Sequence, residues 1–159
     1  MRKRSAYRPR QVLQNPLAFV LENITPITQH ENYLLDLQLK NSSAMQNLLQ
    51  GRADKRDMNT LIAMSNITEL LQEMSFGKGY ENVCVDGREA LIGIIMRAVK
   101  IKRFTPTGAE IQALNTLMEL HDAQMDVITV KDMDDAIKLG KTKISNKKAT
   151  VLPDVEVVT

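Results

Sequence analysis

The sequence predicts an all-α fold, with five or six helices packed as an orthogonal or bundle-like single domain. Apolar residues recur at steps of three and four along most of the chain, which is the helical period. Helix-capping patterns stand in front of several of these stretches. The length of 159 residues suits one domain, and the 43% of hydrophobic residues can fill a core. Aromatic residues make up only 4%, so we expect that core to be aliphatic and rich in methionine.

The domain is expected to span residues 15–146, between a flexible basic arm at 1–14 and an extended tail at 147–159. Its first helix should begin at Asn15 and Pro16, because Asn is a good N-cap and Pro fits the first helical turn. Pro26 ends that helix early, since the residue before a proline avoids helical geometry.

The second helix is predicted over 29–40, opened by a capping box of Thr28 and Glu31. Residues 41–43, Asn-Ser-Ser, could break this helix or only bend it. The apolar pattern then resumes and stops at Gly51, a residue type that often follows a helix.

The third helix is the most regular, with Asp54 as its N-cap and a stop at residues 76–79. Its apolar residues follow steps of three and four: Met58, Leu61, Met64, Ile67, Leu71 and Met74.

The fourth helix is predicted over 80–103, with Asp86 as an alternative start. Its apolar residues point in nearly every direction around the helix, which indicates either the central helix or one that also meets another subunit. The segment 88–102 is therefore the predicted surface for a homodimer. A short buried strand at 91–96 is the alternative.

Capping boxes also open the last two helices. Thr107 and Glu110 begin one that should run to Ile128, and Thr129 and Asp132 begin another.

The charges are segregated along the chain. Residues 1–10 hold five Lys and Arg and no acid, and residues 138–148 hold five Lys and no acid. Residues 11–137 hold 11 Lys and Arg against 17 Asp and Glu, a net charge of −6. Two basic ends on an acidic body are the clearest indication of function in the sequence.

The basic ends are the candidate binding residues for a nucleic acid or another partner. Lysines and arginines could follow a phosphate backbone, and a tyrosine could stack on a base. The alternative is a solvated tail that keeps the chain soluble. The candidate residues are Arg2, Lys3, Arg4, Tyr7, Arg8, Arg10, Lys141, Lys143, Lys147 and Lys148.

No recognised catalytic or metal-binding motif occurs in the sequence, so we expect neither an enzyme nor a cofactor. His121 lies on an apolar helix face and is predicted to be a core histidine with one hydrogen-bond partner. Cys84 is predicted to pack as a small apolar residue. Glu69 and Glu73 are expected on a solvated helix face, and residues 77–79 in a turn.

The sequence also lacks the apolar segments of a signal peptide or a membrane helix. We therefore expect a cytoplasmic protein without membrane contact.

Two stretches, 1–9 and 120–133, resemble small helical proteins encoded in phages and prophages of Gram-negative bacteria. The resemblance would cover residues 1–140. It implies an accessory protein in a bacterial cytoplasm and carries no known site residues. The sequence thus predicts a non-enzymatic protein whose acidic helical body binds a host macromolecule, for example to inhibit a nucleic-acid or defence enzyme. The alternative is nucleic-acid binding through the arm and the 138–148 segment.

Overall fold

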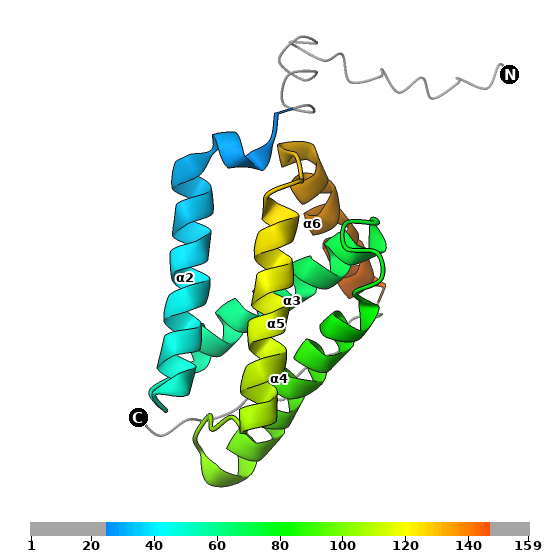
Figure 1. Ribbon diagram of the computed structural model, residues 1–159. Helices are drawn as coiled ribbons and strands as arrows, with labels where there is room; N and C mark the ends of the chain where they lie inside the picture. Colours follow the sequence, from blue (N-terminus) through cyan, green and yellow to red (C-terminus); the bar gives the residue numbers. More distant parts are fainter. Residues whose placement is uncertain (1–24, 147–159) are drawn as a thin grey trace, which may run out of the picture.

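Five α-helices and one short 3₁₀ turn make up the described part of the chain, residues 25–146 of a computed structural model (Figure 1). The 3₁₀ turn η1 spans Ile27–Gln29. The α-helices follow in the order α2 (Glu31–Leu49), α3 (Lys55–Glu73), α4 (Glu81–Ile101), α5 (Gly108–Met125) and α6 (Val130–Ser145). The all-α prediction is confirmed. The predicted arm at 1–14, the helix from Asn15 and the tail at 147–159 lie outside the described residues.

The helix α3 occupies the centre of the fold, because α2, α4, α5 and α6 all pack against it (Figure 1). Its inward side chains include Leu61, Met64 and Leu71, which are almost fully buried. The sequence placed α4 as one candidate for the central helix. That position belongs to α3, and α4 instead covers one side of the molecule together with α5.

Side-chain caps begin three of the helices as the sequence predicts. Asp54 accepts hydrogen bonds from the backbone N–H groups of Arg56 (2.7 Å) and Asp57 (2.9 Å) at the start of α3. Thr107 and Glu110 form a reciprocal box at the start of α5, and Thr129 and Asp132 form one at the start of α6. Each box satisfies backbone donors that a helix start leaves unpaired.

The predicted capping box of Thr28 and Glu31 is wrong. Thr28 lies inside η1, which is held by a hydrogen bond from the Ile27 backbone N–H to the Ile128 carbonyl (3.0 Å). The helix α2 starts at Glu31 after His30, without a side-chain cap. It then continues without interruption through Asn41, Ser42 and Ser43, so these residues do not break it.

The helix α4 begins at Glu81 rather than at Asp86, and it includes residues 91–96, which rules out the alternative strand. Leu91, Ile94 and Ile95 are buried, whereas Met96 is 52% exposed. The outer face of α4 is therefore apolar in part, and no described helix packs over it.

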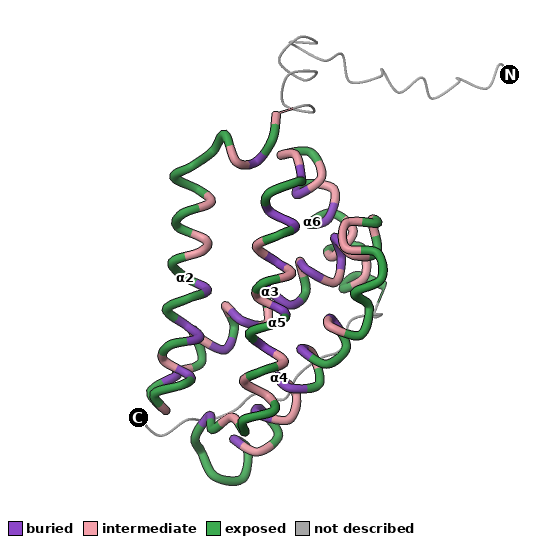
Figure 2. The backbone as a smooth tube through the Cα atoms, viewed as in Figure 1, coloured by how far each residue is buried: buried purple, intermediate pink, exposed green. Residues whose placement is uncertain are grey.

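The core comprises two groups of buried side chains. One lies among α2, α3, α4 and α5, and the other lies where α3 and α6 meet η1 and the end of α5. Burial is uneven along α2: none of residues 31–40 is buried, while Ala44, Met45 and Leu48 are (Figure 2).

Candidate functional site: an acidic groove between two helices

The predicted basic binding surface is only partly within the described chain. Arg2, Lys3, Arg4, Tyr7, Arg8, Arg10, Lys147 and Lys148 lie outside it. Lys143 pairs with Glu73 of α3, and Lys138, in the same segment, pairs with Asp135 at 3.6 Å. Lys141 is exposed and makes no ion pair with any described residue. The described part of this segment, residues 138–146, thus already holds part of its charge in internal pairs.

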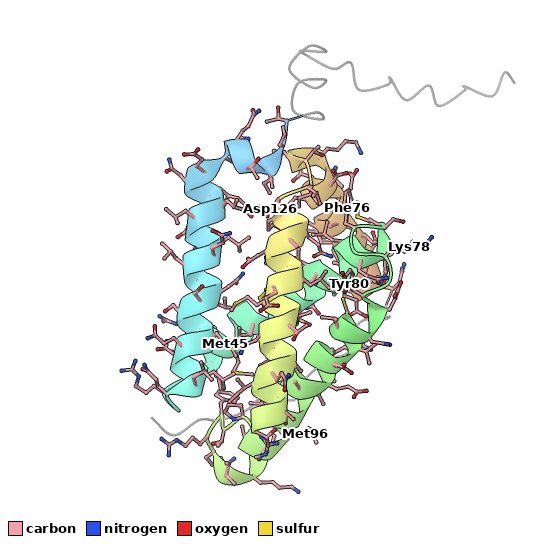
Figure 3. All side chains as sticks on the ribbon, in the orientation of Figure 1. Met45, Phe76, Lys78, Tyr80, Met96 and Asp126 are labelled. Atoms are coloured by element: carbon pink, nitrogen blue, oxygen red, sulfur yellow. The ribbon has the colours of Figure 1, made fainter. Side chains whose placement is uncertain are left out.

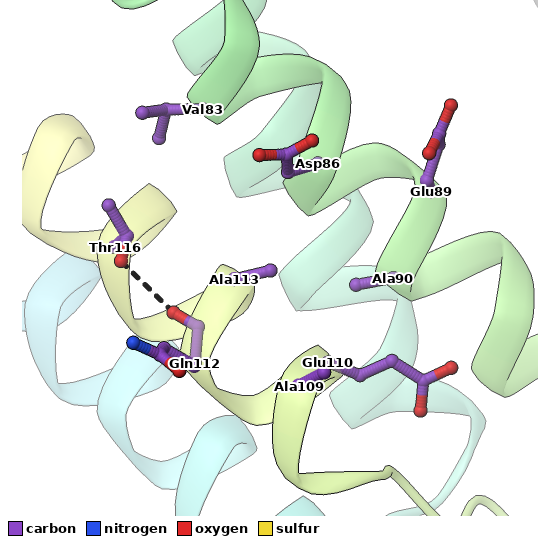
Figure 4. A pocket seen from close by; sticks show the side chains of 9 residues that line it. All are labelled: Val83, Asp86, Glu89, Ala90, Ala109, Glu110, Gln112, Ala113 and Thr116. Atoms are coloured by element: carbon purple, nitrogen blue, oxygen red, sulfur yellow. Dashed lines mark hydrogen bonds between the residues drawn. The ribbon is translucent and has the colours of Figure 1, made fainter.

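A groove of about 570 Å³ runs between α4 and the first half of α5 (Figure 4). Ala90, Ala109 and Ala113 keep its floor low, since a methyl group fills little space. Polar and acidic side chains stand along the edges. The lining residues are Val83, Asp86, Glu89 and Ala90 from α4, with Ala109, Glu110, Gln112, Ala113 and Thr116 from α5.

The close approach of α4 and α5 depends on a glycine. A Cβ atom placed on Gly87 would lie 2.6 Å from Leu117 Cδ2 and 3.1 Å from Leu117 Cβ. Gly87 therefore provides the space that Leu117 fills in the core. The two helices are held at the distance at which their small side chains form the groove floor.

Two carboxylates on the groove edge are without a partner. Asp86 and Glu89 are exposed, and neither forms a hydrogen bond or ion pair with another described residue. In Figure 4, Asp86 projects from α4 on the side that faces α5. Both groups are free to attract a cation in the groove.

The third carboxylate of the groove is held in place. Arg97 donates to both oxygens of Glu110, at 2.8 and 3.1 Å, and the Thr107 backbone N–H donates at 2.6 Å. Burial would raise the pKa of Glu110, but the hydrogen bonds from Arg97 and Thr107 hold this pKa below its usual value. Glu110 remains ionised and fixed at one end of the groove.

Glu69 and Glu73, expected on a solvated helix face, both form ion pairs between helices. Glu69 pairs with Arg88 of α4, and Glu73 pairs with Lys143 of α6. They stabilise the packing of α3 rather than form a reactive pair.

His121 is the core histidine that the sequence predicts. It is 1% exposed, and its Nδ1 lies 3.1 Å from the Thr68 hydroxyl. Because Thr68 donates its own proton to the Met64 carbonyl at 2.8 Å, His121 Nδ1–H is the donor in this pair. Burial lowers the pKa of His121 to about 4, so the ring is neutral near pH 7. Its Nε2 atom has no partner among the described residues.

The Cys84 thiol is not a reactive nucleophile. It is 3% exposed, and burial, with the nearby Glu69 carboxylate, raises its pKa to about 11. Within residues 25–146, no group of three or more His, Cys, Asp and Glu side chains could hold a metal ion. In the same range, no helix is both long and apolar enough to span a membrane.

The structure also forms a basic end that the sequence analysis missed. Arg103 Nη2 donates to the Gly51 carbonyl at 3.2 Å, which joins the loop after α4 to the loop after α2. The linear charge count concealed this cluster because its cations lie in two segments separated by many acidic residues. Its exposed members are Arg52, Arg56, Lys100, Lys102 and Arg103.

Comparisons with known proteins return no match for this chain, whether against family models, curated proteins or solved structures. The resemblance to phage-encoded proteins therefore stays a prediction.

Proposed function

We propose that this chain is a non-enzymatic binding protein whose α4–α5 groove receives a cationic segment of a partner protein. The observation that carries the proposal is the pair of unpartnered carboxylates, Asp86 and Glu89, beside a floor of alanines. Lys or Arg side chains could lay their apolar stems on Ala90 and Ala113 and bring their charges to the edge. Glu110 is ionised and fixed at one end of the groove, but Arg97 balances its charge, so the attraction comes from Asp86 and Glu89.

Other features of the described chain support binding rather than catalysis. His121 is neutral and enclosed, and Cys84 is buried and protonated near pH 7. Neither lines the groove. The groove combines a concave alanine floor with carboxylates at its edge, which suits the binding of a cationic partner. This agrees with the sequence-based prediction that the acidic helical body binds a host macromolecule.

Nucleic-acid binding is the second candidate function, and the basic end favours it. Arg52, Arg56 and Lys102 are exposed where the two loops meet, and such a cluster can contact phosphates. Replacing all three by Gln should then abolish a steep salt dependence of oligonucleotide binding. Unchanged binding by this variant would exclude the basic end as the contact.

The protein-binding proposal can be tested with a fluorescein-labelled peptide of alternating arginine and alanine. Anisotropy titrations of the full-length chain at low salt should give saturable binding. We expect D86N/E89Q to bind at least about five-fold more weakly, because two exposed charge contacts are lost. Salt should weaken the unaltered chain more than this variant.

The matched control is E31Q/D134N. Glu31 and Asp134 are also exposed carboxylates without a partner in the described chain, but they do not line the groove. This variant has the same net charge as D86N/E89Q. If it loses as much affinity, the peptide responds only to overall charge and the groove proposal is wrong.

A further inference from the structure

The outer face of α4 carries a stripe with the spacing of a coiled-coil seam. Val85, Glu89, Ile92, Met96 and Val99 follow one another at steps of four, three, four and three. Steps of this kind keep the residues on one line along a helix. Met96 is 52% exposed, Val99 38% and Val85 36%, and Ile92 is half-buried. The stripe is thus apolar at its centre and faces away from the core (Figure 3 labels Met96).

The charges of α4 are opposite at its two ends. Residues 81–89 carry three acids, Glu81, Asp86 and Glu89, and the single base Arg88. Residues 97–101, at the other end of the helix, carry the bases Arg97 and Lys100 and no acid, and Arg97 is paired with Glu110. Lys102 and Arg103 follow directly after the helix. Two copies of this helix side by side would repel each other if parallel and attract each other if antiparallel.

We propose that the outer face of α4 binds a second copy of this chain through an antiparallel helix pair. Ile92 of each copy then packs against Met96 of the other, near a two-fold axis. The same register places Glu89 of each copy beside Val99 and Lys100 of the other. Because antiparallel helices related by a two-fold axis bring the same flank together, the Glu89 and Lys100 side chains meet on one side of the seam. The face is self-complementary, as an isologous dimer requires.

The dimer is expected to be weak. The seam covers 15 residues of α4, or roughly 22 Å at 1.5 Å per residue. A single helix seam of this length is expected to bury less than the roughly 800 Å² per partner of a standard interface. A dissociation constant on the order of 100 µM fits a contact of this size. The inference shares one residue, Glu89, with the groove proposal. The apolar seam residues Val85, Ile92, Met96 and Val99 do not line the groove.

Sedimentation equilibrium of the full-length chain, from about 10 µM to about 1 mM, tests the dimer. The mass should rise from 17.9 kDa toward twice that value. The substitution M96E should hold the chain at 17.9 kDa throughout the range. The control L39E places the same charge on an apolar residue of α2 that is 61% exposed, and it should leave association unchanged. A mass of 17.9 kDa for the unaltered chain at about 1 mM, or dissociation by L39E as well, would overturn the proposal.

A charge exchange tests the antiparallel register separately. E89K and K100E alone should each weaken association about ten-fold, because each creates two repulsive pairs per dimer. The double variant E89K/K100E should recover to within about three-fold of the unaltered chain. If the double variant stays as weak as the single ones, Glu89 and Lys100 do not meet, and the antiparallel pairing is wrong. M96E separates the two proposals, because Met96 does not line the groove: this variant should fail to dimerise and still bind the peptide. E89K changes both surfaces and is read only for association.

Discussion

The α4–α5 side and the α3–α6 side of the molecule use their charges differently. On the α3–α6 side, Glu73 pairs with Lys143, and Asp135 lies between Lys131 and Lys138. On the α4–α5 side, Asp86 and Glu89 stand at the edge of a groove without a partner among the described residues. Charges in internal pairs contribute to packing, whereas unpaired charges at a concave surface attract an oppositely charged partner. The charges that remain free to bind a partner are therefore those of the acidic groove between α4 and α5, more than those of α6.

The largest expected effect is at the interface that joins the two sides, where His121 of α5 meets Thr68 of α3. The folded pKa of His121 is about 4, below its ordinary value of 6.5. Between these values the unfolded chain binds a proton that the folded chain excludes. The contribution of His121 to the free energy of unfolding is therefore fully present above about pH 6.5. It is lost as the pH falls toward 4, and the total loss is about 3 kcal/mol.

Urea unfolding at several pH values checks this effect. Subtracting the curve of H121Q from that of the unaltered chain isolates the contribution of His121, since carboxylates contribute to both. We expect H121Q to lose much less stability than the unaltered chain between pH 7 and pH 4. Parallel curves would show that the imidazole does not titrate as its burial implies.

The next effect concerns the contact that brings α4 and α5 together. G87A should lower the free energy of unfolding by about 1–2 kcal/mol, because the new Cβ collides with Leu117 and outweighs the helix propensity of alanine. The control G108A adds a Cβ with nothing within 4 Å, so it should leave stability unchanged or slightly higher. Thermal unfolding of both variants measures the difference. A G87A protein as stable as G108A would mean that α4 and α5 do not depend on this close approach.

The smallest expected effect is the difference in stability between carboxylate variants with an internal ion pair and those on the α4–α5 groove. E69Q and E73Q each remove an ion pair and should cost about 0.5 kcal/mol, because these pairs are partly exposed and screened by water. D86N and E89Q break no ion pair between described residues, so they should leave the free energy of unfolding unchanged or raise it slightly. Equilibrium unfolding of the four single variants at low salt checks the ranking. A loss for D86N or E89Q equal to that for E69Q would remove the contrast between the two sides.

The sequence predicts local features of the fold well and spatial ones poorly. The caps at Asp54, Thr107 and Thr129 depend on neighbouring residues, so their patterns identify the true starts of α3, α5 and α6. The Thr28 box fails because a distant contact, from Ile27 to Ile128, determines the local conformation. Serines 42 and 43 also fit within α2, because their side chains are exposed and burial of Ala44 and Met45 outweighs their low helix propensity.

The candidate site was predicted only in part. The net charge of residues 11–137 indicated an acidic surface, but it did not show which carboxylates are unpaired. Glu69 and Asp86 have the same sign in the sequence, and only the packing of Arg88 beside Glu69 separates their roles. The groove floor could not be predicted from the sequence, because Ala90 and Ala113 lie on different helices and alanine carries no functional group that marks a site.

The most direct test of the central claim maps the peptide on the protein by NMR. Amide shifts of the full-length chain are recorded as the arginine–alanine peptide is added. The groove proposal predicts that the largest changes fall on residues 83–90 of α4 and 109–116 of α5, and that D86N/E89Q removes them. Changes centred on α6, or changes in the groove that D86N/E89Q leaves intact, would contradict it.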